Sequence, residues 1–146
     1  MSLSDWAKNG WLRAHQTNRA QIMDLFGIVD RDLEDCSRDL SPDWQFGIAC
    51  NAALKLCSIL VYAEGYRPEK NLAHYRTLQA LPLVLGQEWS DDADYLDACR
   101  AKRNTAEYDV AGCVSAHEAK ELRAFVAKLR MAVLDWLRLS HPHLCA

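Results

Sequence analysis

Apolar residues recur at helical spacing along nearly the whole chain, and this periodicity is what most constrains the fold. The clearest case follows residue 115, where one stripe consists of Leu122, Phe125, Val126, Leu129, Val133, Trp136 and Leu137. Spacings of three and four residues place side chains on one face of an α-helix, and the alternation typical of a half-buried strand is almost absent. The sequence therefore predicts an all-α protein.

Start and stop signals divide this pattern into four long helices and shorter ones. Long helices are predicted over about 17–39, 42–64, 90–109 and 116–139, with shorter helices over 4–13 and about 71–85. In chain order, the expected caps and breaks are Ser41 followed by Pro42, then Gly65, a kink at Pro82 before Gly86, Ser90, and the capping box of Ser115 and Glu118. Short connections favour antiparallel neighbours, so we expect an up-and-down antiparallel helical bundle of four long helices plus short helices.

Length and charge limit the organisation further. A chain of 146 residues matches one domain, with a core over about 17–140 and a short tail over 141–146. The 17 basic and 20 acidic side chains give a net charge of −3. This balance argues against a generally basic nucleic-acid coat, so any site for an anion must be local.

Cysteine and acidic residues give no signal for a metal or a cofactor. The six cysteines form no CxxC pair and no zinc-finger spacing, so buried free thiols are expected at positions 36, 50, 57, 99, 113 and 145. Asp91, Asp92 and Asp94 are interpreted as first-turn residues that complement the positive end of a helix rather than as metal ligands. The five tryptophans are better explained by packing than by base stacking.

Targeting signals are also missing from the sequence pattern. The N-terminal stretch lacks the charged start and apolar run of a signal peptide, and no eighteen apolar residues follow one another. We therefore expect a cytoplasmic location and no membrane partner.

One short segment, "LDACRAKRNTAEYD" (residues 96–109), concentrates polar side chains on an otherwise ordinary helix. At 100° per residue, an arc of about 140° holds a set of six side chains. They are Asp97, Arg100, Arg103, Asn104, Glu107 and Tyr108. One interpretation is a solvated face with ion pairs at Asp97–Arg100 and Arg103–Glu107. The other is an anion site formed by Arg100, Lys102, Arg103 and Asn104.

The segment "RAKRNTAEYD", late on the penultimate long helix, resembles the signature of the HEPN superfamily. The stretches "NAALKLCSILVYAEGYRP", "AHYRTLQALPLVLG" and "GCVSAHEAKELRAF" are similar to its other helices, so the resemblance covers roughly residues 24–142. It implies a helical domain that commonly forms a homodimer, with the motif helices meeting at a cleft. In active members this cleft cuts RNA without a metal.

The chain departs from the family motif at its last position. Arg103 and Asn104 match the Arg and the following polar residue, but Tyr108 stands where a histidine is expected, and residues 102–112 contain no histidine. Metal-independent cleavage needs a group that takes the 2′-OH proton near neutral pH, which suits histidine, whereas tyrosine has a pKa near 10. His74, on the short helix, is the best substitute elsewhere in the chain.

Two functions follow as alternatives. The first is a HEPN-like module, expected to be a homodimer, that binds RNA or a nucleotide through Arg100, Arg103 and Asn104, or that serves as the helical partner of a nucleotidyltransferase. Tyr108 is then a hydrogen-bond donor, a stacking residue or a modification acceptor. The second is a metal-independent endoribonuclease of the toxin or phage-defence type. Its catalytic residues would be Arg103, Asn104 and Tyr108, assisted by His74, Glu107 or Asp97.

Overall fold

The computed structural model describes residues 1–145, and helices account for most of them, which confirms the all-α class. Its elements, in chain order, are α1 (Leu3–Lys8), β1 (Leu12–Ala14), α2 (Arg19–Asp35), α3 (Pro42–Ala63), β2 (Tyr66–Pro68), α4 (Ala73–Gln79), α5 (Leu81–Leu85), the 3-10 turn η1 (Gln87–Trp89), α6 (Ser90–Tyr108), α7 (Ala116–Ser140) and the 3-10 turn η2 (Pro142–Leu144).

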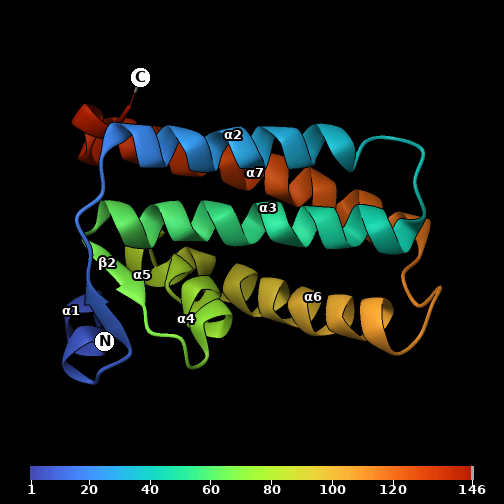
Figure 1. Cartoon of the computed structure of the whole chain (residues 1–146), viewed down its shortest axis with the longest axis horizontal. Coiled ribbons are helices and arrows are strands. Elements are labelled where there is room, and N and C mark those ends of the chain that lie inside the picture. The colour runs from blue at the N-terminus through green and yellow to red at the C-terminus, as the bar shows by residue number, and fades with distance from the viewer. Residues whose placement is uncertain (146) are drawn as a thin grey trace.

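Helix α3 is the centre of the bundle. It packs most extensively against α7 and α2, and less against α6. Figure 1 shows α3 between α2 on one side and α6 on the other. Its buried residues include Phe46, Ala49, Ala53, Leu56 and Leu60. By length and hydropathy α3 alone, within residues 1–145, could span a membrane, but 61% of the apolar stretch is buried inside the bundle. Both properties are those of a central core helix.

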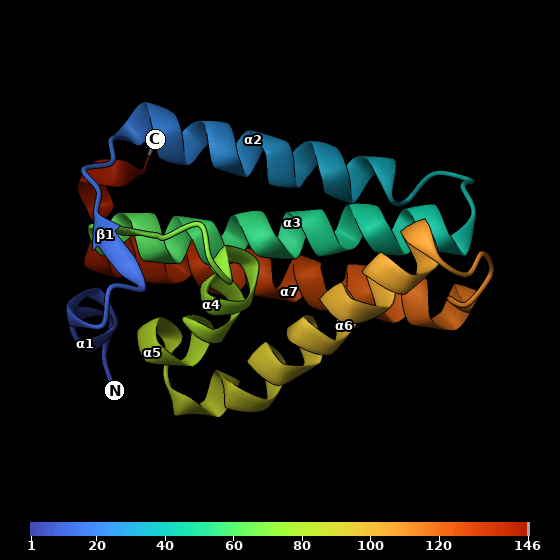
Figure 2. The ribbon, with the colours of Figure 1, turned by 60° about the horizontal axis from the view of Figure 1, so that its bottom comes forward.

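The directions of the helices follow the predicted up-and-down order, with one difference. The chain runs one way along α2 and α6 and the opposite way along α3 and α7 (Figure 1). The pairs α2–α3 and α3–α6 are therefore antiparallel, but α3 and α7 lie side by side and run in the same direction. Helix α6 lies obliquely below α3 (Figure 2), while α7 returns along another side of it.

Helix boundaries agree with most of the predicted signals. The Ser41 hydroxyl accepts the Trp44 backbone N–H at 3.3 Å, and Ser115 and Glu118 form the predicted capping box. Gly86 ends α5 with a φ of +118°, a conformation that favours glycine. The Ser90 cap is wrong, because η1 runs directly into α6 and makes Ser90 the first helical residue.

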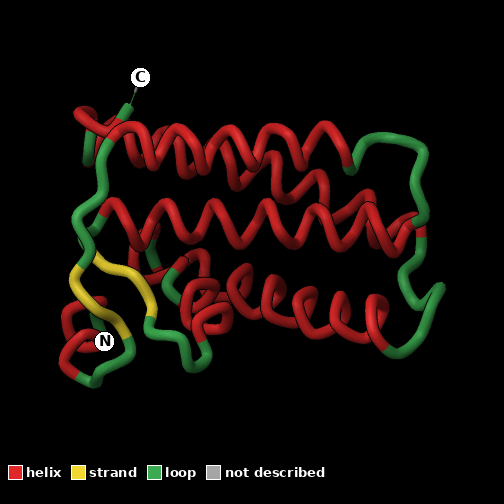
Figure 3. Tube along the Cα trace, viewed as in Figure 1, coloured by secondary structure: helices red, strands yellow, loops and turns green. Residues whose placement is uncertain are grey.

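The structure also corrects two short segments. The helix predicted over 4–13 ends at Lys8, and β1 follows it and pairs antiparallel with β2, in a register that sets Leu12 opposite Pro68 (Figure 3). The segment 71–85 divides at Ala80 into α4 and α5. Within the predicted tail over 141–146, Pro142–Leu144 form η2, whose Leu144 is buried against the core, and residue 146 lies outside the described residues.

Candidate functional site

The arginines of the polar arc on α6 carry ion pairs with carboxylates one turn away. Arg100 pairs with Asp97 at 2.9 Å, and Arg103 pairs with Glu107 at 3.3 Å between Nη2 and Oε2. Both arginine side chains are about one-third exposed. The ion pairs predicted along this face are thus confirmed, and each arginine remains accessible at the surface.

Lys102 belongs to a different side of α6. Its ammonium group forms an ion pair with Glu118 in the first turn of α7, together with a hydrogen bond. This contact, joined by the backbone N–H of Ser115, lowers the pKa of Glu118 to about 2. Lys102 therefore ties α6 to α7 and does not join the two arginines.

Asn104 and Tyr108 lie on the outer part of the arc. Both are exposed, and the Tyr108 side chain has 75% of its surface open to solvent. Neither residue lines a pocket that Arg100 or Arg103 reaches. The arc predicted from the sequence therefore divides into an arginine part that faces neighbouring helices and an outer part that faces solvent.

A first pocket, which we name the His74 pocket, lies between α3, α4 and α6 and has a volume of about 280 Å³. Its nitrogen-bearing side chains come from all three helices: Asn51 and Lys55 from α3, His74 from α4, and Arg100 and Arg103 from α6. His74 and Arg100 also line an adjoining surface hollow. The sequence named His74 as the best substitute histidine, and the structure brings it to the same pocket as the arginines.

The charge around His74 favours the neutral imidazole. Partial burial lowers the pKa of His74, and the positive charges of Arg100, Lys55 and Arg103 lower it further. A neutral imidazole near neutral pH retains one nitrogen that can accept a proton or a hydrogen bond.

The inner wall of the His74 pocket is apolar and chemically inert. Leu54, Leu78 and Leu96 contribute to it, together with Cys50 and Cys99. The Cys50 thiol donates to the Cys99 carbonyl oxygen at 3.7 Å, and burial raises the pKa of Cys50 to about 12 and that of Cys99 to about 11. Such thiols remain protonated and are weak nucleophiles. All six cysteines are unpaired, as predicted, but only Cys36, Cys57 and Cys99 are buried, and the other three are partly exposed.

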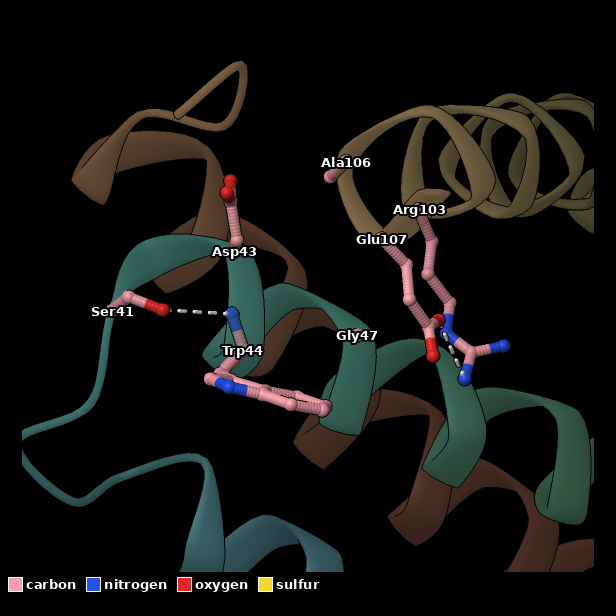
Figure 4. A pocket seen from close by; sticks show the side chains of 7 residues that line it. All are labelled: Ser41, Asp43, Trp44, Gly47, Arg103, Ala106 and Glu107. Atoms are coloured by element: carbon pink, nitrogen blue, oxygen red, sulfur yellow. Dashed lines mark hydrogen bonds and ion pairs between the residues drawn. The ribbon is translucent and has the colours of Figure 1, made fainter. Parts of the chain in front are cut away.

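A second pocket, which we name the Trp44 pocket, has a volume of about 230 Å³ and lies between the start of α3 and the end of α6 (Figure 4). Arg103 and Glu107 extend toward it from α6, and the Trp44 indole lies along its other side (Figure 4). Arg103 lines both pockets, so the two pockets adjoin at its side chain.

Arg103 lies close to α3 at Gly47. A Cβ atom at this position would be 3.5 Å from Arg103 Nε and 3.8 Å from its Cγ. Arg103 Nε is buried and has no hydrogen-bond partner among residues 1–145. The stem of the arginine is therefore packed against the helix, while its terminal nitrogens reach the surface.

Asp43 fixes the far edge of the Trp44 pocket. Its carboxylate accepts the backbone N–H of Gly112 at 2.7 Å and that of Val114 at 3.3 Å. Both amides belong to the loop between α6 and α7, so Asp43 anchors this loop to the first turn of α3.

Lys55, Trp44 and Gly47 are site residues that sequence reasoning missed. Lys55 is a lone cation on an apolar helix, and its proximity to α6 follows from tertiary packing alone. The sequence held a weak signal that Trp44 is exposed. It lies two positions before Phe46, where the buried stripe begins, and residues two apart point to different sides of a helix.

No family model, curated protein or solved structure matches this chain. Within residues 1–145, no group of three or more histidine, cysteine or acidic side chains is arranged to hold a metal ion.

Proposed function

We propose that the chain binds a phosphate group of RNA or of a nucleotide in the His74 pocket. The observation that carries this proposal is the convergence of Lys55, Arg100 and Arg103 from two helices on one hollow of an acidic protein. Guanidinium groups bind phosphate through paired N–H donors, and concentrated positive charge in a cleft attracts anions although the net charge is negative. The HEPN-like module predicted from the sequence has the same ligand class.

The apolar wall supports an organic phosphate in preference to a free inorganic ion. Leu54, Leu78 and Leu96 line the same pocket as the cations, so a sugar or base can contact carbon while the phosphate meets the guanidinium groups. Ligand sites commonly combine mostly apolar walls with a few fixed polar groups.

Fluorescence anisotropy with a labelled ten-nucleotide oligouridylate, at 50 mM and at 200 mM salt, tests the proposal. We expect binding at low salt that weakens at high salt, because phosphate contacts release counterions. Arg100→Ala and Arg103→Ala each weaken binding and reduce the salt dependence.

Arg138→Ala is the matched control, since Arg138 is exposed in the last turn of α7 and lines neither pocket. Equal losses for Arg138→Ala and Arg103→Ala would indicate non-specific attraction and contradict a built site.

A second candidate, a metal-independent endoribonuclease, is favoured by one observation. His74 lies in the pocket with both arginines, and its lowered pKa keeps the imidazole neutral, as a general base requires. In this mechanism His74 takes the 2′-OH proton, the 2′ oxygen attacks the adjacent phosphate, and the arginines stabilise the developing charge. The bond from phosphorus to the 5′ oxygen breaks, the leaving oxygen takes a proton from water, and the His74 imidazolium returns its proton to the hydroxide that remains. The products are a 2′,3′-cyclic phosphate and a 5′-hydroxyl.

Incubation of total RNA with the protein in EDTA distinguishes the enzyme from the binding module. Cleavage that is lost in His74→Ala and that slows as the pH falls below His74's pKa would favour the nuclease. Intact RNA, together with binding in the anisotropy assay, would support the binding module and contradict the nuclease.

We also propose the homodimer and the nucleotidyltransferase partner that the resemblance implies. Light scattering of the purified chain measures the oligomeric state, and a mass increase on Tyr108 after co-expression with such a partner would mark the tyrosine as its acceptor.

A further inference from the structure

Trp44 differs from the four other tryptophans in having no partner for its ring. The ring centres of Trp6 and Trp11 lie 6.0 Å apart in an edge-to-face arrangement, and those of Trp136 and His141 lie 5.2 Å apart. Lys128 lies 5.7 Å from the ring centre of Trp89. Among residues 1–145, Trp44 has no such aromatic or cationic neighbour, and 62% of its surface is exposed. From the sequence, we expected packing to explain all five tryptophans. Packing within the described chain, however, does not explain Trp44.

The exposed indole borders a hollow that contains both hydrogen-bond donors and hydrogen-bond acceptors. Figure 4 shows Trp44 on one side of the Trp44 pocket, with the Arg103 and Glu107 side chains extending from the other. A flat ring that enters this space can stack on the indole while its edge meets a donor on Arg103 or an acceptor on Glu107. Nucleobases have a π-face for stacking and a polar edge for hydrogen bonds.

Charge assigns the two pockets to different parts of one ligand. The Trp44 pocket is lined by the carboxylates of Asp43 and Glu107, which repel a phosphate, whereas the His74 pocket carries Lys55, Arg100 and Arg103. Arg103 borders both pockets. A phosphate on the His74 side thus places the neighbouring nucleoside near Trp44.

We propose that the Trp44 pocket is a base-stacking subsite for single-stranded RNA whose adjacent phosphate is held by Arg103. The subsite rests on the proposed function, because the phosphate must occupy the His74 side. It favours a single strand, since bases in a duplex are stacked on one another and do not offer a free face.

Two oligomers of equal length separate the base from the backbone. The first is a ten-nucleotide oligouridylate, and the second carries the same phosphates but has a tetrahydrofuran spacer in place of every nucleoside. The wild-type protein is expected to bind the oligouridylate more tightly. Trp44→Ala should weaken oligouridylate binding by roughly 5- to 150-fold, the range typical of one stacked base, and leave binding of the spacer oligomer unchanged.

Trp44→Phe keeps an aromatic face and should retain most of the preference for bases. Met131→Ala is the matched control, because Met131 is 65% exposed on α7 and lines neither pocket. Thermal melts of all three variants establish that each is folded.

The outcomes distinguish the two proposals. Equal wild-type affinity for both oligomers, or an equal loss for both in Trp44→Ala, overturns the stacking subsite and leaves the phosphate site standing. Binding of neither oligomer at low salt overturns both proposals.

Discussion

The Lys102 ammonium group and the Glu118 carboxylate form an ion pair between α6 and the first turn of α7. Tyr95 of α6 also contacts α7, since its hydroxyl donates to Glu121 at 3.4 Å and its ring centre lies 5.5 Å from that of Phe125. The ion pair therefore adds a charged link between the arginine-bearing helix and the last helix of the bundle.

This pair predicts a loss of stability in acid. The pKa of Glu118 is lowered from 4.5 to about 2, so its stabilising effect is fully present above about pH 4.5 and is lost as the pH falls toward 2. Glu118→Gln keeps an oxygen that can accept the Ser115 N–H but removes the charge. We expect the melting temperature of the variant to lie below that of the wild type at pH 7, and the difference to shrink below pH 4.5.

Asp135→Asn is the control for this prediction, since it removes an exposed carboxylate of α7 that forms no ion pair within residues 1–145. A wild-type advantage over Glu118→Gln that stayed constant from pH 7 to pH 2.5 would refute the assigned role of the pair.

The carboxylates on the arginine face should compete with a bound phosphate. Glu107 engages the Nη2 group of the Arg103 guanidinium, and Asp97 does the same for Arg100. Glu107→Gln or Asp97→Asn should therefore tighten oligonucleotide binding by about 1.4- to 5-fold, because exposed ion pairs contribute about 0.2–1 kcal/mol. Anisotropy titrations at low salt measure this gain.

Glu34→Gln on α2 is the control for this prediction. It removes the carboxylate whose Oε1 lies 3.4 Å from Arg38 Nη2, in an ion pair that lies outside both pockets. If it tightened binding as much as Glu107→Gln, the gain would come from net charge alone.

Gly47 should tolerate a methyl group and reject a larger side chain. In Gly47→Ala the added Cβ makes ordinary contacts with Arg103, and alanine is favoured over glycine inside a helix by about 0.5–1 kcal/mol. We expect a higher melting temperature with unchanged RNA affinity. Gly47→Leu should displace Arg103 and weaken RNA binding.

Gly27 on α2 provides the matched pair, because a Cβ there meets nothing within 4 Å. Gly27→Leu should leave RNA affinity intact, and a crystal structure of Gly47→Leu with an unmoved Arg103 would disprove the steric account.

Thiol reactivity should follow burial. Burial raises the pKa of Cys57 and of Cys50 to about 12, so few thiolates form there near pH 8. Cys113 and Cys145 are only partly buried. Mass spectrometry after brief iodoacetamide treatment should find the label on Cys113 and Cys145 before Cys57. Early labelling of Cys57 would show that the core opens readily.

Local signals allowed much of the fold to be predicted, because each acts within a few residues. Ser41, Ser115 and Glu118 cap helices through hydrogen bonds to their own first turns, and these boundaries were confirmed. The strands β1 and β2 are three residues long, too short for an alternating pattern, and pair only because the fold brings them together. The parallel arrangement of α3 and α7 likewise depends on packing.

The candidate site was predictable only along a single helix. The ion pairs of Arg100 and Arg103 follow from helical spacing. The placement of His74 and Lys55 beside these arginines depends on three helices meeting, and the departure of Lys102 depends on the position of Glu118. Periodicity assigns a residue to a face, but it does not identify the element that covers that face.

The contacts of Asp43 bear on the order in which the protein folds. The segment between Asp43 and the amides of Gly112 and Val114 is about 70 residues long, whereas α2 and α3 are neighbours joined by a short loop. Closing the longer loop costs more chain entropy, so this contact should form after the rate-limiting step. Asp43→Asn should then accelerate unfolding and leave the refolding rate nearly unchanged, so that the end of the bundle holding Trp44 is the last part to close.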